Sequence, residues 1–225
     1  IREAGFSGVI ARVSESMERE QLLPDLFYDM SYMGIIVFGI IDEAYARLVV
    51  GKGKPVVLLD SYYRSLSCPS VTSANVEGAY EATRHLIERG HRAIGFIGPT
   101  NLTTSHDERW FGYWKAMRDH RLQVDARLCL TESAGFLGNK EELAAYLDAL
   151  KEKPTALLFG NDRLALLFME LAAERGIRIP EEISLVGFDD LKEAAISQPP
   201  LTTMRVDKTG MGAAAVELLS LAAAG

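Results

Sequence analysis

Cysteine and long apolar runs are scarce in this sequence. Its two cysteines, Cys68 and Cys129, have neither the CxxC spacing of a redox motif nor the spacing of metal ligands, which favours buried, reduced thiols. No apolar run approaches the roughly 20 residues that a membrane helix needs, and the first residues do not resemble a signal peptide. We therefore expect a soluble globular protein in a cytoplasmic setting, with no membrane partner.

Positive charge is also in short supply. Lys and Arg number 24 against 31 Asp and Glu, and 24 − 31 gives a formal net charge of −7. Domains that hold nucleic acid present a basic surface to the phosphates. This portion of the chain is therefore not expected to bind nucleic acid by itself.

Metal-binding and catalytic motifs are missing as well. There is no Gly-x-Ser-x-Gly elbow and no phosphate loop, and Gly51–Lys54 is followed too soon by Pro55 to form a dinucleotide loop. We expect no metal, no cofactor and no enzymatic activity. The histidines, which show no metal-ligand spacing, are His85, His91, His106 and His120.

What the sequence does contain is a repeated pattern of short apolar runs that end in glycine or acid. Ile183–Asp190 has this pattern, and so do Ala156–Asp162 and Ile94–Pro99. Such runs are typical of parallel strands buried on both faces, and ligands bind beyond the carboxyl ends of these strands. Three strand ends are thus expected at one crevice, with Asp189 at its edge. Further strands, alternating with helices in a βαβ pattern, are expected at Gly8–Ala11, Gly34–Phe38 and Val56–Asp60.

Polar residues at capping positions predict where several helices begin. Asn75 can cap a helix that ends near Gly90. Ser105 and Glu108 have capping-box spacing for the next helix, so that Arg109 falls in its first turn. Further helices are expected after Asn139, from Asn161 or Asp162 to Arg175, and from Met211 to Ala224.

The helix from Asp162 to Arg175 is apolar on two faces. Its first stripe consists of Leu164, Leu167, Phe168 and Leu171. The first stripe is enough to cover the core of this part of the protein, so the second stripe has no obvious place there. We expect the second stripe to lie at the interface of a homodimer. This second stripe consists of Leu166, Met169 and Ala173.

Five segments match those of a known protein family in residue pattern, in order and in spacing. They are Glu88–Gly98, Arg109 with Gly112, Pro154–Leu164, Pro180–Asp190 and Pro199–Thr203. Together they resemble the effector-binding core of the lactose-repressor/galactose-repressor (LacI/GalR) family of bacterial transcription regulators. This core shares its fold with periplasmic sugar-binding proteins, and the resemblance covers nearly the whole chain.

The resemblance implies an α/β fold of two Rossmann-like lobes, each a parallel sheet flanked by helices, with a ligand cleft between the lobes. Residues 1–98 with 207–225 would form one lobe, and residues 99–206 the other. The family also has a helix-turn-helix, a first strand and a first helix before the point where Ile1 stands, and a last strand beyond Gly225. The chain lacks these, so we expect it to be part of a longer protein.

The resemblance also implies a charged pair at the effector. Asp189, the first acid after Gly-Phe, matches the family's ligand-binding aspartate. A carboxylate can accept two hydroxyl hydrogen bonds from a sugar. The alternative role of Asp189 is a helix cap, which suits Asp190 better. Arg109 matches the family arginine that binds ligand oxygens, and its alternative is an ion pair with Asp107 or Glu108.

Three further positions are implied to bind the ligand. Asn161 offers a donor and an acceptor at a strand end, with helix capping as its alternative. Phe136 lies where the family often has an aromatic residue that stacks on the ligand, and a core position is its alternative. Ser105 is the third position, with helix capping as the more common role.

These expectations leave three functions open. The first is a transcription regulator whose core closes on a small, sugar-like effector and thereby shifts the DNA-binding heads of a homodimer on operator DNA. The second is a periplasmic sugar-binding protein of an ABC transporter, and the third, an α/β enzyme, rests on the fold class alone. Pro199–Thr203 and the turn Gly90–Arg92 favour the first.

Overall fold

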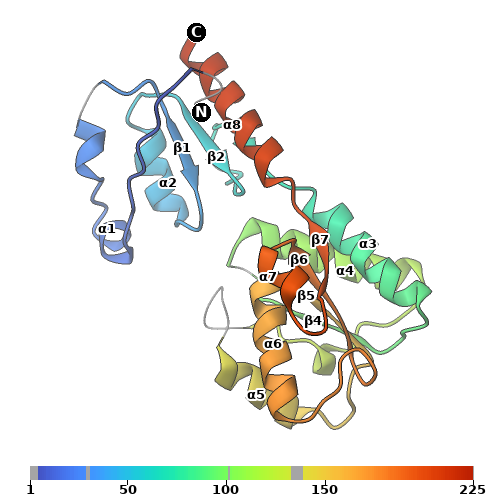
Figure 1. Cartoon of the computed structure of the whole chain (residues 1–225). Coiled ribbons are helices and arrows are strands. Elements are labelled where there is room, and N and C mark those ends of the chain that lie inside the picture. Colours follow the sequence, from blue (N-terminus) through green and yellow to red (C-terminus); the bar gives the residue numbers. More distant parts are fainter. Residues whose placement is uncertain (1–4, 29–30, 101, 133–138, 225) are drawn as a thin grey trace. The chain divides into compact units, whose positions relative to one another are not determined.

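The computed structural model describes residues 5–28, 31–100, 102–132 and 139–224, and the chain forms two compact units (Figure 1). Unit 1 consists of Ile1–Ser73 together with Asp207–Gly225, and unit 2 consists of Ala74–Val206. Among the described residues, no helix combines the length and the apolar character needed to cross a membrane.

The first boundary between the units lies after Ser73 and not, as expected, after Gly98. The residues in between form α3 (Asn75–Glu88) and β4 (Ile94–Ile97). Both elements belong to unit 2, because α3 packs along α4 and β4 pairs with β5. The second boundary, after Val206, is the expected one.

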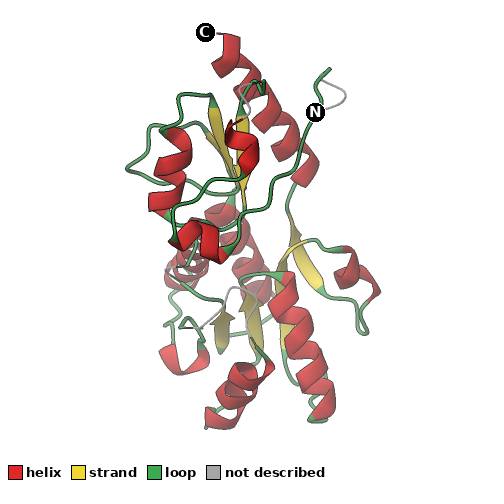
Figure 2. Ribbon diagram, turned by 90° about the vertical axis from the view of Figure 1, so that its left-hand side faces the viewer, coloured by secondary structure: helices red, strands yellow, loops and turns green. Residues whose placement is uncertain are grey.

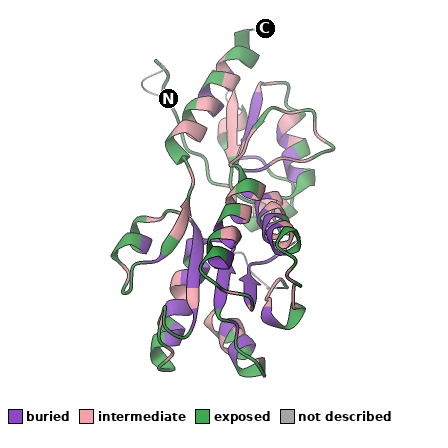
Figure 3. Ribbon diagram, turned by 90° about the vertical axis from the view of Figure 1, so that its right-hand side faces the viewer, coloured by how far each residue is buried: buried purple, intermediate pink, exposed green. Residues whose placement is uncertain are grey.

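Unit 2 is built on a parallel sheet of four strands in the order β4, β5, β6, β7. Every residue of β4 and of β5 is buried (Figure 3). A strand that is buried on both faces needs no polar residue at alternate positions, which is why these strands read as continuous apolar runs. The bounds are β5 (Ala156–Phe159), β6 (Ser184–Asp189) and β7 (Thr202–Arg205).

Helices cover both faces of this sheet. On one face, Leu158 packs with Tyr113 of α4 in a core that α3 also lines. On the other, Phe159 packs with Phe168 of α6 in a core that α5 also lines. Neighbouring residues of β5 therefore serve opposite layers, as the alternation of a strand requires. The helices are α4 (Thr104–Asp119), the 3-10 helix Ala126–Leu128, α5 (Lys140–Ala149), α6 (Asp162–Glu174) and α7 (Lys192–Ile196).

Unit 1 has a smaller parallel sheet in the order β1, β2, β3. Leu58 of β2 packs with Tyr45 of α2 on one face, and Val57 packs with Leu219 of α8 on the other. The C-terminal helix therefore completes the core of this unit. The elements are α1 (Glu15–Arg19), the 3-10 helix Asp25–Tyr28, β1 (Ile35–Phe38), α2 (Glu43–Val50), β2 (Val56–Leu59), β3 (Ser70–Val71) and α8 (Lys208–Ala224).

The expected strands from Gly34–Phe38 onwards are confirmed, but the first expected strand is wrong. Gly8–Ala11 forms no strand and lies in the long connecting segment before α1 (Figure 2). Val9 is 74% exposed and Ile10 is 87% exposed. An apolar run becomes a strand only where a neighbouring strand offers hydrogen bonds, and neither described sheet includes this segment.

Two of the expected helix caps are also wrong. The N-cap of α3 is Ala74, which makes no side-chain bond, and Asn75 is the first residue of the helix itself. The N-cap of α4 is Thr103, whose Oγ1 accepts a hydrogen bond from the backbone N–H of His106 at 3.2 Å. Ser105 therefore lies inside the first turn. The expected cap of α5 is confirmed, since Asn139 Oδ1 accepts from the N–H of Glu142 at 2.6 Å.

The second apolar stripe of α6 is divided between core and surface. Met169 is buried in the core of unit 2, so the expectation that it lies on a spare face is wrong. Leu166 is half-buried against the same core, and Ala173 is exposed. The packing of α6 against both α5 and the sheet accounts for the burial of Met169.

Candidate functional site

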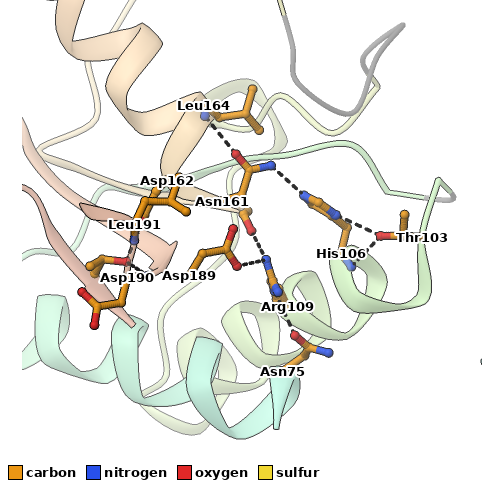
Figure 4. A network of polar contacts seen from close by, with 12 residues as sticks. Asn75, Thr103, His106, Arg109, Asn161, Asp162, Leu164, Asp189, Asp190 and Leu191 are labelled. Atoms are coloured by element: carbon orange, nitrogen blue, oxygen red, sulfur yellow. Dashed lines mark hydrogen bonds and ion pairs between the residues drawn. The ribbon is translucent and has the colours of Figure 1, made fainter. Parts of the chain in front are cut away.

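Asp189 and Arg109 meet at the carboxyl edge of the sheet in unit 2 (Figure 4). Asp189 is the last residue of β6, and Arg109 lies in the second turn of α4 because the helix begins earlier than expected. Arg109 Nη1 and Asp189 Oδ1 are 3.3 Å apart. The two charged residues that are expected to bind the effector thus form an ion pair with each other.

Arg109 is held on several sides. Its Nε donates to Asn75 Oδ1 at 2.9 Å, and its Nη1 donates to the carbonyl oxygen of Gly160 at 2.6 Å. Its guanidinium lies over the ring of Phe188, 3.9 Å from the ring centroid. The side chain is only 4% exposed. These contacts fix the guanidinium, which forms its ion pair with Asp189.

Asn75 is a site residue that the sequence reasoning missed. Its Oδ1 accepts from Arg109, and its Nδ2 donates to Glu108 Oε2 at 2.9 Å. An Asn at the start of a helix favours a capping role, which hides other roles from sequence reasoning. Here the amide is 1% exposed and orients the guanidinium instead.

Asn161 is the N-cap of α6. Its Oδ1 accepts from the N–H of Leu164 at 2.9 Å, and its Nδ2 lies 3.4 Å from His106 Nε2. The residue is 2% exposed. The capping alternative is therefore realised, while a contact of Asn161 with a ligand stays a prediction.

His106 is a second residue that the sequence reasoning missed. Burial, and then the charge of Arg109, lower the pKa of His106 to about 3, so its ring is neutral at pH 7. Since the amide of Asn161 donates to Nε2, we assign the ring proton to Nδ1, which lies 2.9 Å from Thr103 Oγ1. A Cβ at position 160 would stand 2.6 Å from His106 Cδ2, so Gly160 is needed for this close approach.

The two remaining predicted ligand-binding residues, Ser105 and Phe136, add little to the description of the site. Ser105 is 5% exposed in the first turn of α4, one residue before His106. Phe136 lies outside the described residues. Among the residues that the structure does describe, no group of three or more His, Cys, Asp or Glu side chains could hold a metal ion.

The polar groups at the carboxyl edge of this sheet can form hydrogen bonds with a ligand. The carboxylate of Asp189 is 26% exposed and can accept from hydroxyl donors, whereas its partner Arg109 is almost wholly covered. Next to this pair, the amide of Asn161 contacts the neutral ring of His106. The arrangement suits the recognition of a polar ligand.

The chain is similar in sequence to named proteins. Residues 83–223 match the family described as periplasmic binding protein-like domain. The arabinose metabolism transcriptional repressor of Geobacillus stearothermophilus is 31% identical over 229 residues, covering 97% of this chain and 62% of the relative. The HTH-type transcriptional repressor PurR of Haemophilus influenzae is 36% identical over 166 residues, covering 73% of this chain and 48% of the relative. The chain spans less than two thirds of either relative.

Solved structures share the fold. The transcriptional regulator CelR in its complex with cellobiose has a TM-score of 0.85 at 24% identity, covering 100% of this chain and 69% of that chain. A LacI family transcriptional regulator from Mycobacterium smegmatis has a TM-score of 0.78 at 25% identity, covering 89% of this chain and 73% of that one. The α/β fold with parallel sheets flanked by helices is thus the fold of these regulators.

Proposed function

Because this chain belongs to the periplasmic binding protein-like domain family, we propose that it is the effector-binding core of a LacI-type transcription regulator. The relatives named above are transcriptional repressors, which favours regulation over delivery of a sugar to a transporter. Operator DNA would be bound by a segment outside this acidic chain, in the cytoplasm, where bacterial DNA lies. The core would bind its effector without catalysing a reaction.

The observation that supports this proposal is the ion pair of Asp189 and Arg109. Asp189 presents its carboxylate at the carboxyl edge of the sheet, where it pairs with Arg109. Carboxylates recognise hydroxyl-rich ligands because each can accept more than one hydrogen bond. We infer that a small, sugar-like effector binds at this edge of the sheet.

The first test is a thermal-shift screen of the complete protein against arabinose, ribose, cellobiose and a set of nucleosides. A ligand at about 100 times its dissociation constant adds roughly 2.7 kcal/mol to stability. The affinity of the best ligand is then measured by calorimetry in Asp189→Asn. Loss of charge-assisted hydrogen bonds should weaken binding about 10- to 100-fold.

The matched control is Asp190→Asn, which neutralises the next carboxylate along the chain, itself 46% exposed. This variant should bind the effector as the wild type does. If Asp189→Asn keeps the wild-type affinity, the site does not use this carboxylate and the proposed function loses its support.

We also propose that the core forms a homodimer through the outer face of α6. Leu166 and Ala173 lie on this face, whereas Met169 is committed to the core of unit 2. A two-fold contact would use each apolar side chain twice. Such a dimer would carry two DNA-binding segments, as an operator with two half-sites requires.

A further inference from the structure

Asp162 is a buried carboxylate with no role in the site as described so far. It is the first residue of α6 and is 0% exposed. Its Oδ1 accepts a hydrogen bond from Thr203 Oγ1 at 2.6 Å, and its Oδ2 accepts from the backbone N–H of Leu191 at 2.8 Å. Its two oxygens therefore bind two separate elements, β7 and the segment that follows β6 (Figure 4).

The segment that Asp162 binds has an unusual backbone. Asp189 has φ 120° and Asp190 has φ 53°, two consecutive positive values at residues other than glycine. Strain of this kind persists only where the surroundings hold it. The N–H of Asp190 donates to Thr203 Oγ1 at 3.3 Å, and the N–H of Leu191 donates to Asp162 itself. Asp162 thus holds the turn directly at Leu191 and, through Thr203, at Asp190.

A glycine in β6 makes room for this carboxylate. A Cβ at position 187 would stand 2.1 Å from Asp162 Oδ1, closer than any side chain allows. The carboxylate therefore lies against the backbone of β6 two residues before Asp189. The contact with Asp162 thus explains the glycine in the run Gly187-Phe188-Asp189.

We propose that Asp162 is a positioning residue for Asp189. By holding both N–H groups of the strained turn, it directs the carboxylate of Asp189 towards Arg109 and towards the effector. Asp162 itself touches no effector, since it is fully buried. This inference rests on the proposed function, in which Asp189 binds the effector.

The test is a double-mutant cycle on the complete protein, read by calorimetry with the effector found in the screen. Thr203→Val removes the hydroxyl that links Asp162 to the turn while it keeps the shape of the side chain. It should weaken binding about fivefold, the usual effect of one lost hydrogen bond. Asp162→Asn should weaken binding further, and Thr203→Ser, which restores the hydroxyl, should recover the wild-type affinity. Thr202→Val, at the exposed neighbouring position of β7, is the control and should change nothing.

The cycle separates positioning from a general structural role. In the Asp189→Asn background, Thr203→Val should have no further effect on affinity, because the carboxylate it positions is gone. An equal loss in both backgrounds would overturn the inference, and so would wild-type affinity in Thr203→Val and Asp162→Asn. If Asp189→Asn alone leaves affinity unchanged, the proposed function fails first, and the two failures are distinguishable.

Discussion

The two parallel sheets of this chain arise from similar apolar runs but differ in how deeply they are buried. In unit 2 every residue of β4 and β5 is buried. In unit 1 the edge strand β1 is half-buried, and Phe38 at its end is 68% exposed. Apolar character alone therefore does not determine burial. The surroundings of the strand matter as well: β5 has a neighbouring strand on each side and helices on both faces, and β4, at the edge of the sheet, is bordered by Leu130 through a bridge with Ile97.

The largest expected effect compares one substitution in both sheets. Leu158→Ala in β5 opens a cavity in a fully buried position and should cost unit 2 about 2 to 5 kcal/mol. Leu59→Ala in β2 removes a half-buried side chain and should cost unit 1 about 1 kcal/mol. Trp110 and Trp114, the two tryptophans of the sequence, lie in unit 2, so tryptophan fluorescence during urea unfolding reports that unit.

Leu158→Ala should move the fluorescence midpoint, and Leu59→Ala should move only the transition seen by circular dichroism. A shift of the fluorescence midpoint in Leu59→Ala would show that the two units unfold together, and the comparison would not hold.

A second, smaller effect concerns pH and is confined to unit 2. The pKa of His106 is lowered from about 6.5 to about 3, mainly by burial. Between these values the unfolded chain binds a proton that the folded unit does not, so stability falls as the pH falls from 6.5 towards 3. Going from pH 7 to pH 5 should therefore cost the wild type about 2 kcal/mol more than it costs His106→Gln. Urea unfolding followed by fluorescence at both pH values measures this difference, and the same pH dependence in both proteins would contradict it.

The smallest effect on folding is expected at the outer face of α6. Leu166→Glu with Ala173→Glu changes one half-buried and one exposed position and should lower the stability of unit 2 by only about 1 kcal/mol. The same pair should dissociate the proposed homodimer, because it puts like charges on both sides of a two-fold contact. Sedimentation at low micromolar concentration checks this, with Arg163→Glu as a charge-changing control on an exposed residue of the same helix. A dimer that survives the double substitution would place the interface elsewhere.

The fold and the central pair were predictable because both depend on strand ends. Parallel strands bring their carboxyl ends to one edge of the sheet, so the position of Asp189 at the end of an apolar run predicts its place there. The capping alternative for Asn161 was equally visible, since a short polar side chain directly before a helix is a local signal. Local signals of this kind survive in the folded structure when no distant group competes for the same atoms.

The residues that support the central pair were not predictable, because their partners lie far away in the sequence. Asn75 and Asp162 stand at helix starts, where local rules suggest capping, but their polar atoms bind Arg109, Thr203 and Leu191 from other parts of the sequence. The buried neutral state of His106 likewise depends on the packing around it. Contacts between distant segments decide these roles, and no spacing within the sequence encodes them.

The division of unit 1 between the two ends of the described chain affects the order in which the protein can fold during synthesis. Unit 2 is continuous, so all its residues have been made once Val206 is added. The sheet of unit 1 is made much earlier, but α8, which packs on Val57, comes after unit 2. The apolar face of that sheet must therefore wait uncovered on the ribosome while more than a hundred residues are added, as Ala74–Val206 is the intervening stretch. Unit 2 is therefore synthesised after the sheet of unit 1 but can complete its fold first.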